Sequence, residues 1–362
     1  MKILQVASHQ NITRGGAVQM VRLARGLRER GEEVDLVFNG GGVLSGELKR
    51  LEEEGFKVRL FPMERMVPKE MLRFRRLVLE EGYQVVHAHR DPALRFAFFS
   101  LLGTDTPLVA QRGTTYRPKG LVRLMLRSPR VRLIVSVAHA VGRSLEEHGV
   151  SSRKIQVVYG SADPEEFSPK VSGGGVRAQF SIASEEFVVG TVAALVGKKG
   201  YPDLLAAVGA LSRRFKGLRL LAVGRGRPEK FREHWEPLSS VVVFTGHRDD
   251  VAECMAAMDV VVSASTKGEG LTGALREAMF MGRPVVSTRV SGNPEVVLQG
   301  KTGLLVEVGD RRGLASAVEG LLLVPALRTR LGLQGRRLAL RLFTHRFRTG
   351  RMVELYREVA VG

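Results

Sequence analysis

The chain has 362 residues, of which 44% are hydrophobic, and this length and composition suit two α/β domains. Its single cysteine, Cys254, excludes an intramolecular disulfide framework, and no apolar run reaches the roughly 20 residues that span a bilayer, so we expect a cytoplasmic protein. The formal net charge of +19 attracts polyanions such as a membrane surface or a phosphorylated substrate, whereas 6% aromatic residues and no recognised binding motif argue against nucleic acid.

The first half of the chain alternates between strand and helix patterns. Residues 3–7 are apolar and predict a buried strand, and the turn Gly15-Gly16 follows them. Apolar residues then recur at helical spacing, namely Ala17, Met20, Val21, Ala24 and Leu27. Gly31 closes this helix, and residues 34–38 predict the next strand. Further patterns predict a helix at 72–79 and strands at 84–88, 133–137 and 154–160.

The alternation restarts after residues 164–175, where Pro, Ser and Gly cluster and predict a linker. The second half predicts a helix at 201–215 and strands at 187–193, 218–224, 241–246 and 258–265. Residues 325–362 have helical periodicity and carry nine Arg against two Glu. The pattern predicts the α/β class, with two doubly wound (Rossmann-like) domains facing each other across a cleft.

Two glutamates separated by seven residues, Glu269 and Glu277, form the most informative pattern. Glu269 lies in a glycine-flanked loop at the carboxyl end of the strand at 258–265, where open α/β sheets bind ligands. Glu277 lies one to two turns into the next helix, whose first amide groups would point at an anion. The two carboxylates could each bind hydroxyl groups of a ligand while the helix amides bind a phosphate between them. This arrangement indicates a sugar joined to a nucleotide as the ligand.

This pair and several other segments, in order, resemble the glycosyltransferases of the GT-B fold, specifically the large retaining family 4. The other matching segments are Gly15-Gly16-Ala17, 136–141, 163–167, Lys199-Gly200, 282–288, Pro294-Glu295-Val296, 303–306 and Gly309-Asp310. The resemblance spans nearly the whole chain. It implies a GT-B architecture in which residues 1–168, joined by a C-terminal helix at about 346–362, bind the acceptor, and residues 169–345 bind a UDP-sugar or GDP-sugar donor.

The resemblance also implies roles for individual residues. Glu277 would bind the ribose hydroxyls, and Glu269 would hold the transferred sugar. Lys199 would neutralise the diphosphate as the glycosidic bond breaks, so Glu269 and Lys199 are the expected catalytic residues. Further donor contacts are expected from Gly15, Gly16, Arg225, Arg248, Gly270, Leu271 and Thr272, in most cases through backbone amides. Because the chain has no Asp-x-Asp sequence, we expect neither a metal nor another cofactor.

Three positions depart from the family pattern. Ala194 stands where an Arg usually clamps the phosphates, so either Arg225 or Arg112 substitutes for it or the donor phosphate is held more weakly. Thr272 stands where a Gly is common. Gln111-Arg112-Gly113 replaces the usual His of the first domain, so Arg112 is expected to contact either an anionic acceptor or the donor in a different way. His87 and His89 alternate on one strand; one is expected to be structural, and His89 is an expected acceptor contact.

Basic residues also recur at helical spacing beside apolar ones. Residues 106–145 contain eight Arg or Lys and no Asp or Glu, and Lys69, Arg73 and Arg76 form a similar series. Such faces are either solvated or bind anionic lipid.

The sequence therefore predicts a retaining, metal-independent glycosyltransferase of hexosyltransferase type that acts on a lipid-linked or anionic glycan acceptor. It would be cytoplasmic, with a possible peripheral site at the inner face of the cell membrane, as in envelope glycan or lipopolysaccharide core assembly. Two alternatives stay open at this stage. One is another GT-B enzyme, such as a sugar-nucleotide epimerase or a phosphorylase. The other is a non-catalytic basic adaptor that binds membrane or nucleic acid.

Overall fold

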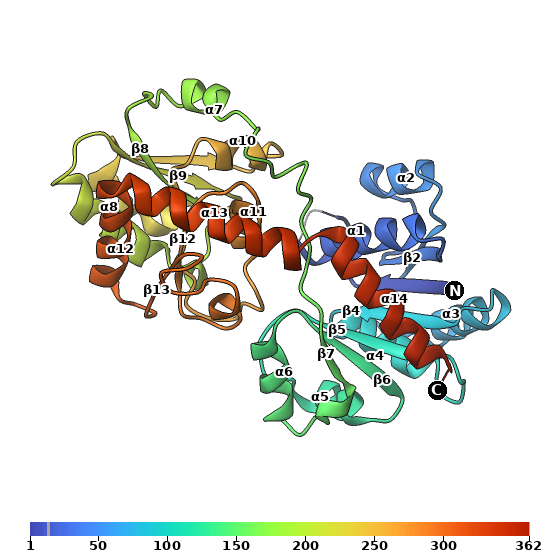
Figure 1. Cartoon of the computed structure of the whole chain (residues 1–362). Coiled ribbons are helices and arrows are strands. Elements are labelled where there is room, and N and C mark those ends of the chain that lie inside the picture. The colour runs from blue at the N-terminus through green and yellow to red at the C-terminus, as the bar shows by residue number, and fades with distance from the viewer. Residues whose placement is uncertain (13–14, 362) are drawn as a thin grey trace. The chain divides into compact units, whose positions relative to one another are not determined.

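The computed structural model describes residues 1–12 and 15–361, which form two compact units (Figure 1). Unit 1 contains Met1–Ser161 and His345–Gly362, and unit 2 contains Ala162–Thr344. The chain enters unit 2 at Ala162, because the Ala162 amide donates to the Phe343 carbonyl at 3.0 Å and Ala162 pairs with Thr344. This division falls a few residues before the boundary expected at 168/169.

Unit 1 is built on a seven-stranded parallel sheet in the order β3-β2-β1-β4-β5-β6-β7. The strands are β1 (Lys2–Ala7), β2 (Glu33–Asn39), β3 (Val58–Phe61), β4 (Val85–His89), β5 (Leu108–Arg112), β6 (Val131–Ser136) and β7 (Ile155–Val157). The helices are α1 (Gly15–Glu29), α2 (Gly46–Glu53), α3 (Pro68–Glu80), α4 (Asp91–Ser100), α5 (Gly120–Arg127), α6 (His139–Glu146) and α14 (His345–Val361). Most strand residues are apolar and buried, as expected when helices cover both faces of a parallel sheet.

The helix expected after the first strand is confirmed as α1. Its buried face contains every apolar residue that the periodicity singled out: Ala17, Met20, Val21, Ala24 and Leu27. The C-terminal helix α14 packs beside α1 in the same unit, with Tyr356 and Leu355 fully buried. Unit 1 is therefore completed by a segment from the far end of the chain.

Unit 2 repeats this plan with a six-stranded parallel sheet in the order β10-β9-β8-β11-β12-β13. The strands are β8 (Phe187–Val192), β9 (Leu218–Val223), β10 (Val242–Gly246), β11 (Val260–Ser263), β12 (Val285–Thr288) and β13 (Leu304–Val306). The helices are α7 (Gly174–Gln179), α8 (Tyr201–Ser212), α9 (Arg232–Trp235), α10 (Val251–Ala256), α11 (Gly273–Phe280), α12 (Arg311–Leu323) and α13 (Pro325–Leu342).

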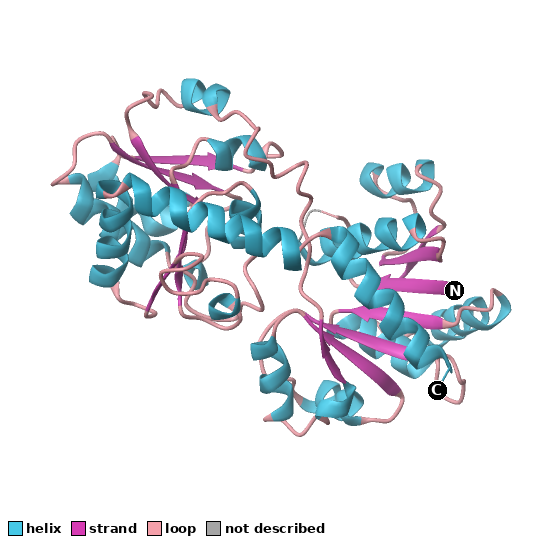
Figure 2. Ribbon diagram, viewed as in Figure 1, coloured by secondary structure: helices cyan, strands magenta, loops and turns pink. Residues whose placement is uncertain are grey.

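In each unit the strands lie between helices, which confirms an α/β fold of two domains (Figure 2). The strand order of each sheet reverses direction at one point, between β1 and β4 in unit 1 and between β8 and β11 in unit 2. Open α/β sheets bind their ligands at the carboxyl ends of the strands beside this reversal. Among the described residues, no helix combines the length and the apolar character needed to cross a membrane.

Candidate active site

The strand reversal of unit 2 brings together the lysine and the first glutamate that the sequence singled out. Lys199 ends the short 3₁₀ helix Gly197–Lys199 after β8, and Glu269 lies in the loop after β11. The Lys199 Nζ donates to Glu269 Oε1 at 2.6 Å, and the two side chains are only 18% and 13% exposed. Solvent screens this sheltered ion pair only weakly. The two charges therefore interact strongly and fix each other's position.

The two loops are held together by their backbones. The Thr266 amide donates to the Lys198 carbonyl at 2.9 Å. Gly200 follows Lys199 with a φ of +70° in the left-handed region, and a Cβ there would lie 1.8 Å from the Ala264 carbonyl oxygen. Only glycine combines this φ with such a close approach at low cost. The register between the lysine and the glutamate therefore depends on Gly200.

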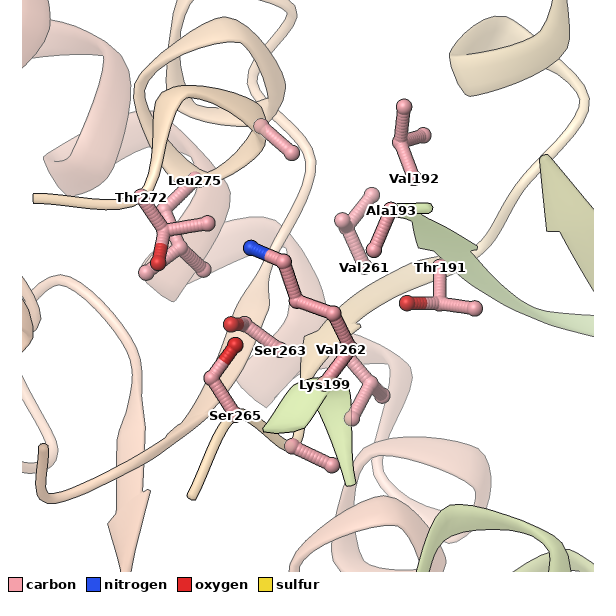
Figure 3. Close-up of a pocket in the computed structure, with 12 residues that line it drawn as sticks. Thr191, Val192, Ala193, Lys199, Val261, Val262, Ser263, Ser265, Thr272 and Leu275 are labelled. Carbon is pink, nitrogen blue, oxygen red and sulfur yellow. The ribbon is translucent and has the colours of Figure 1, made fainter. Parts of the chain in front are cut away.

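A small pocket opens at the carboxyl ends of β8 and β11 beside this pair. Its lining includes Lys199 and the hydroxyl side chains of Thr191, Ser263, Ser265 and Thr272 (Figure 3). Figure 3 shows the Lys199 ammonium group extending into this space, on the side of Thr272. The Ser265 hydroxyl also contacts Glu269 Oε1 at 3.4 Å. The pocket thus combines one cation with several hydroxyl groups, a composition suited to phosphate and sugar oxygens.

The helix that was expected to carry Glu277 is confirmed as α11. Glu277 lies in its second turn and is partly exposed, and Thr272 is the residue before the helix. The Thr272 amide, expected to contact the donor, instead donates to Asn293 Oδ1 at 3.1 Å. Asn293 is fully buried and also donates to the Ser287 hydroxyl at 2.9 Å, so this bond is part of the core. The Gly270 carbonyl accepts from the Gly292 amide at 2.8 Å, one residue before Asn293. Leu271 is buried.

Two other basic residues expected at the donor site have different surroundings. Arg225 is exposed in the turn after β9, and its carbonyl accepts from the Leu195 amide at 2.8 Å. Arg248 donates to Asp250 at 2.7 Å and lies over the Phe180 ring at 5.8 Å. The hydrogen bond with Asp250 raises the pKa of Arg248. Arg248 therefore anchors the start of α10 within unit 2, and its guanidinium already has a carboxylate partner.

In unit 1, the glycine turn lies at the start of α1. Gly15 and Gly16 are exposed first-turn residues of this helix, and a Cβ on Gly16 would lie 3.2 Å from the ring of His9. His9 is buried at the carboxyl end of β1. Exposed amides at the start of a helix can bind an anion, which keeps the expected phosphate role of this turn chemically sound.

His87 and His89 point to the same face of the sheet, as their alternation predicted, with ring centroids 4.2 Å apart. His87 Nδ1 lies 2.6 Å from the Tyr356 hydroxyl, and His89 Nε2 lies 2.7 Å from Gln5 Oε1. Gln5 also donates to Tyr356 at 3.0 Å. Burial lowers the pKa of His87 to about 3 and also lowers that of His89. Both histidines are held by buried hydrogen bonds, and the acceptor contact expected at His89 stays a prediction.

Arg112 ends β5 and is also buried, with 7% exposed. Its guanidinium forms an ion pair with Asp91, at the start of α4, and donates to the Tyr116 carbonyl at 3.2 Å. The side chain therefore holds the loop after β5 against α4. The contact between Arg112 and an anionic acceptor stays a prediction, and an anion at this position would have to compete with Asp91 for the guanidinium.

Sequence reasoning missed Asn293, Ser263 and Ser265. Ser263 and Ser265 lie two positions apart at the end of β11, the spacing that places two side chains on one face. Asn293 precedes the Pro294-Glu295-Val296 segment, but nothing in the local sequence pairs it with Thr272. Among residues 1–12 and 15–361, no group of three or more His, Cys, Asp or Glu side chains could hold a metal ion.

The sequence matches two family models of glycosyltransferases. Residues 13–166 match the model described as Glycosyltransferase Family 4, and residues 186–323 match the model described as Glycosyl transferases group 1. The chain belongs to glycosyltransferase family 4. The prediction of a glycosyltransferase is thereby confirmed, and the alternatives of an epimerase, a phosphorylase or a non-catalytic adaptor are set aside.

Named relatives of this glycosyltransferase include a lipid mannosyltransferase and an enzyme of lipopolysaccharide core biosynthesis. It is 27% identical over 335 residues to the phosphatidyl-myo-inositol mannosyltransferase of Mycobacterium leprae, covering 87% of this chain and 86% of that one. It is 34% identical over 165 residues to the lipopolysaccharide core biosynthesis glycosyltransferase LpsE of Rhizobium meliloti, where the match covers 44% of this chain and 46% of LpsE. The crystal structure of Anabaena HepE in complex with UDP has the same fold, with a TM-score of 0.87, 21% identity and coverage of 99% and 100%.

Proposed function

We propose that this glycosyltransferase transfers a hexosyl group from a nucleotide sugar with retention of configuration and without a metal. The observation that carries the proposal is the Lys199–Glu269 pair at 2.6 Å, beside a pocket at the strand reversal of unit 2. Glu277 lies on α11, the helix that begins at the same pocket. The UDP complex of HepE supports a nucleotide at this kind of site.

The chemistry follows from these charges. Glu277 binds the ribose diol, Glu269 accepts hydrogen bonds from the transferred sugar, and Lys199 stabilises the charge that grows on the leaving diphosphate. The acceptor hydroxyl oxygen bonds to the anomeric carbon as the bond from that carbon to the phosphate oxygen breaks. The hydroxyl proton passes to the departing phosphate oxygen, so the protein needs no general base. Because Lys199 and the start of α11 supply positive charge, we expect transfer to continue in EDTA.

The first prediction concerns Glu277. Glu277→Ala should lower the affinity for one nucleotide class, UDP or GDP, by roughly 10- to 100-fold, because hydrogen bonds to a carboxylate contribute about 1.5–3 kcal/mol. A thermal-shift titration with UDP, GDP and ADP measures this loss.

Glu233→Ala is the matched control for the thermal-shift titration, since the Glu233 side chain is 85% exposed on α9. If the wild-type protein is stabilised by none of the nucleotides, or if both variants respond as the wild type does, the donor site proposed here is wrong.

For the acceptor, we propose a lipid-linked or anionic glycan at an anionic membrane surface, in line with the printed names of the two relatives. The structure distinguishes the two basic helices of unit 1. On α3, Arg73 is engaged, because it donates to the Leu60 carbonyl at 2.8 Å and pairs with Glu70. On and beside α5, six exposed residues form what we call the α5 patch: Tyr116, Arg117, Lys119, Leu121, Leu124 and Arg127.

The α5 patch has the composition of a peripheral membrane site. Leu121 and Leu124 are 47% and 61% exposed, and the residues 106–145 around them carry no acidic side chain. Exposed leucines insert into the interface of a bilayer, and each nearby Lys or Arg contributes about 1 kcal/mol at an anionic surface. The patch therefore fits anionic lipid headgroups better than any other surface of unit 1 that the sequence singled out.

A second prediction tests the α5 patch. Replacing both Leu121 and Leu124 by Ser should lower binding to vesicles that contain phosphatidylglycerol by roughly tenfold, because the buried apolar area is lost. Co-sedimentation at fixed salt measures the binding. The control is Leu333→Ser with Leu340→Ser on α13, where both leucines are also exposed and lie among arginines. Equal losses in the two double variants would show that no specific face of the protein docks.

A further inference from the structure

Thr272 carries a polar group that the fold leaves without a partner. The residue is 7% exposed, and its Oγ1 has no hydrogen-bond partner among the described residues. It also lines the pocket that holds Lys199 (Figure 3). Leaving a buried hydroxyl unpaired destabilises a fold by about as much as a lost hydrogen bond, so such a group calls for an explanation.

The position of Thr272 makes this absence informative. Threonine before the first residue of a helix usually accepts a hydrogen bond from an amide of the first turn. Here Thr272 precedes α11 in an extended conformation, with φ −66° and ψ 121°, yet its side chain makes no capping bond. Its amide is already bonded to Asn293 at 3.1 Å, so the backbone of Thr272 is fixed from the core side. The hydroxyl is therefore the group of this residue that can still bind a ligand.

The surroundings of the hydroxyl favour an anion. The Lys199 ammonium group extends into the same pocket on the side of Thr272 (Figure 3). The start of α11 adds the positive end of the helix dipole, which attracts phosphate oxygens. The carboxylate of Glu269 accepts hydrogen bonds from Lys199 at 2.6 Å and from Ser265 at 3.4 Å. A hydroxyl in such a field gains most by donating to a negatively charged oxygen.

We infer that the Thr272 hydroxyl donates a hydrogen bond to the terminal phosphate of the donor's diphosphate. This inference rests on the proposed function, because it assumes that a nucleotide diphosphate enters the pocket of unit 2. Thr272 then contacts the leaving group alongside Lys199, and it helps the enzyme to distinguish a nucleoside diphosphate from a monophosphate.

The test replaces Thr272 by valine, which has the same shape but lacks the hydroxyl. In a thermal-shift or calorimetric titration, Thr272→Val should weaken binding of the preferred nucleoside diphosphate roughly 10- to 100-fold, because hydrogen bonds to charged groups are strong. Binding of the matching monophosphate should change less than twofold. The ligand-free protein should melt at the same temperature or higher, because an unpaired buried hydroxyl has been removed. Thr272→Ser should keep diphosphate affinity within a few-fold of the wild type.

Thr302→Val is the matched control, since Thr302 is equally buried but its hydroxyl is satisfied, donating to the Val296 carbonyl and accepting from the Leu298 amide. This variant should lower the melting temperature without changing the preference for diphosphate over monophosphate. The inference is overturned if Thr272→Val binds the diphosphate as well as the wild type, or if it weakens only the intact nucleotide sugar. If the wild-type protein binds no nucleotide, both the inference and the proposed donor site fail; a loss confined to Glu277→Ala rejects the inference alone.

Discussion

Lys199→Ala is expected to lower kcat/KM for sugar transfer by roughly 10²–10³-fold, because it removes the cation that stabilises the leaving diphosphate. The Lys199 side chain is only 18% exposed, so water that enters in its place would stabilise the leaving diphosphate poorly. Substitution also leaves the Glu269 carboxylate without its ammonium partner at 2.6 Å. The measurement is initial-rate kinetics with the nucleotide sugar that the thermal-shift screen identifies.

Two further variants make this result specific. Lys198→Ala changes the adjacent lysine. The Lys198 carbonyl accepts from the Thr266 amide at 2.9 Å, and the substitution keeps this backbone bond. The rate of transfer should therefore stay within a few-fold of the wild type. Combining Lys199→Ala with Glu269→Gln should cost less than the sum of the single changes, because the two side chains act as one unit. If Lys198→Ala and Lys199→Ala reduce kcat/KM equally, general positive charge rather than the Lys199–Glu269 pair is responsible.

Much of the fold could be predicted because its strands and helices differ in period. The strand expected at 241–246 is β10 (Val242–Gly246), and the helix expected at 201–215 is α8 (Tyr201–Ser212). Both elements could be predicted because the spacing of apolar residues that defines them is visible within a short stretch of sequence. The helical pattern at 325–362 forms two helices, α13 and α14, which part at Phe343 and Thr344 because the chain there returns from unit 2 to unit 1. Periodicity alone does not show such a change of unit.

Only the part of the site that lies in loops and helices directly after strands could be predicted from the sequence. Glu269 and Glu277 could be predicted because one lies in the loop after an apolar strand and the other in the following helix, whereas Lys199 was expected from the family resemblance. The surroundings of His89 and Arg112 could not be predicted, because Gln5, Tyr356 and Asp91 become their neighbours only through the tertiary fold. The same holds for Asn293, which takes the Thr272 amide that the sequence had assigned to the donor. Contacts of this kind depend on register between strands, which one sequence does not reveal.

Gly200→Ala is expected to destabilise unit 2 by about 3 kcal/mol and to lower its melting temperature by roughly 6–12 °C. Two costs act together, because the φ of +70° disfavours any side chain and the new Cβ would lie 1.8 Å from the Ala264 carbonyl oxygen. The only relief is a shift of the loop with Lys199 away from the loop with Glu269. Activity should therefore fall by at least tenfold even at temperatures where the variant is fully folded, since small misplacements of catalytic groups are costly.

Gly197→Ala separates this effect from a general loss of glycine. Gly197 begins the same short helix, but a Cβ there would meet nothing within 4 Å, and its φ is not positive. This variant should melt close to the wild type, or slightly above it because alanine restricts the unfolded chain. Comparable melting temperatures and rates for Gly200→Ala and Gly197→Ala would show that the approach of Gly200 to Ala264 does not set the spacing of Lys199 and Glu269. A selective loss in Gly200→Ala would instead tie the activity of this glycosyltransferase to a single backbone contact between two strand-end loops.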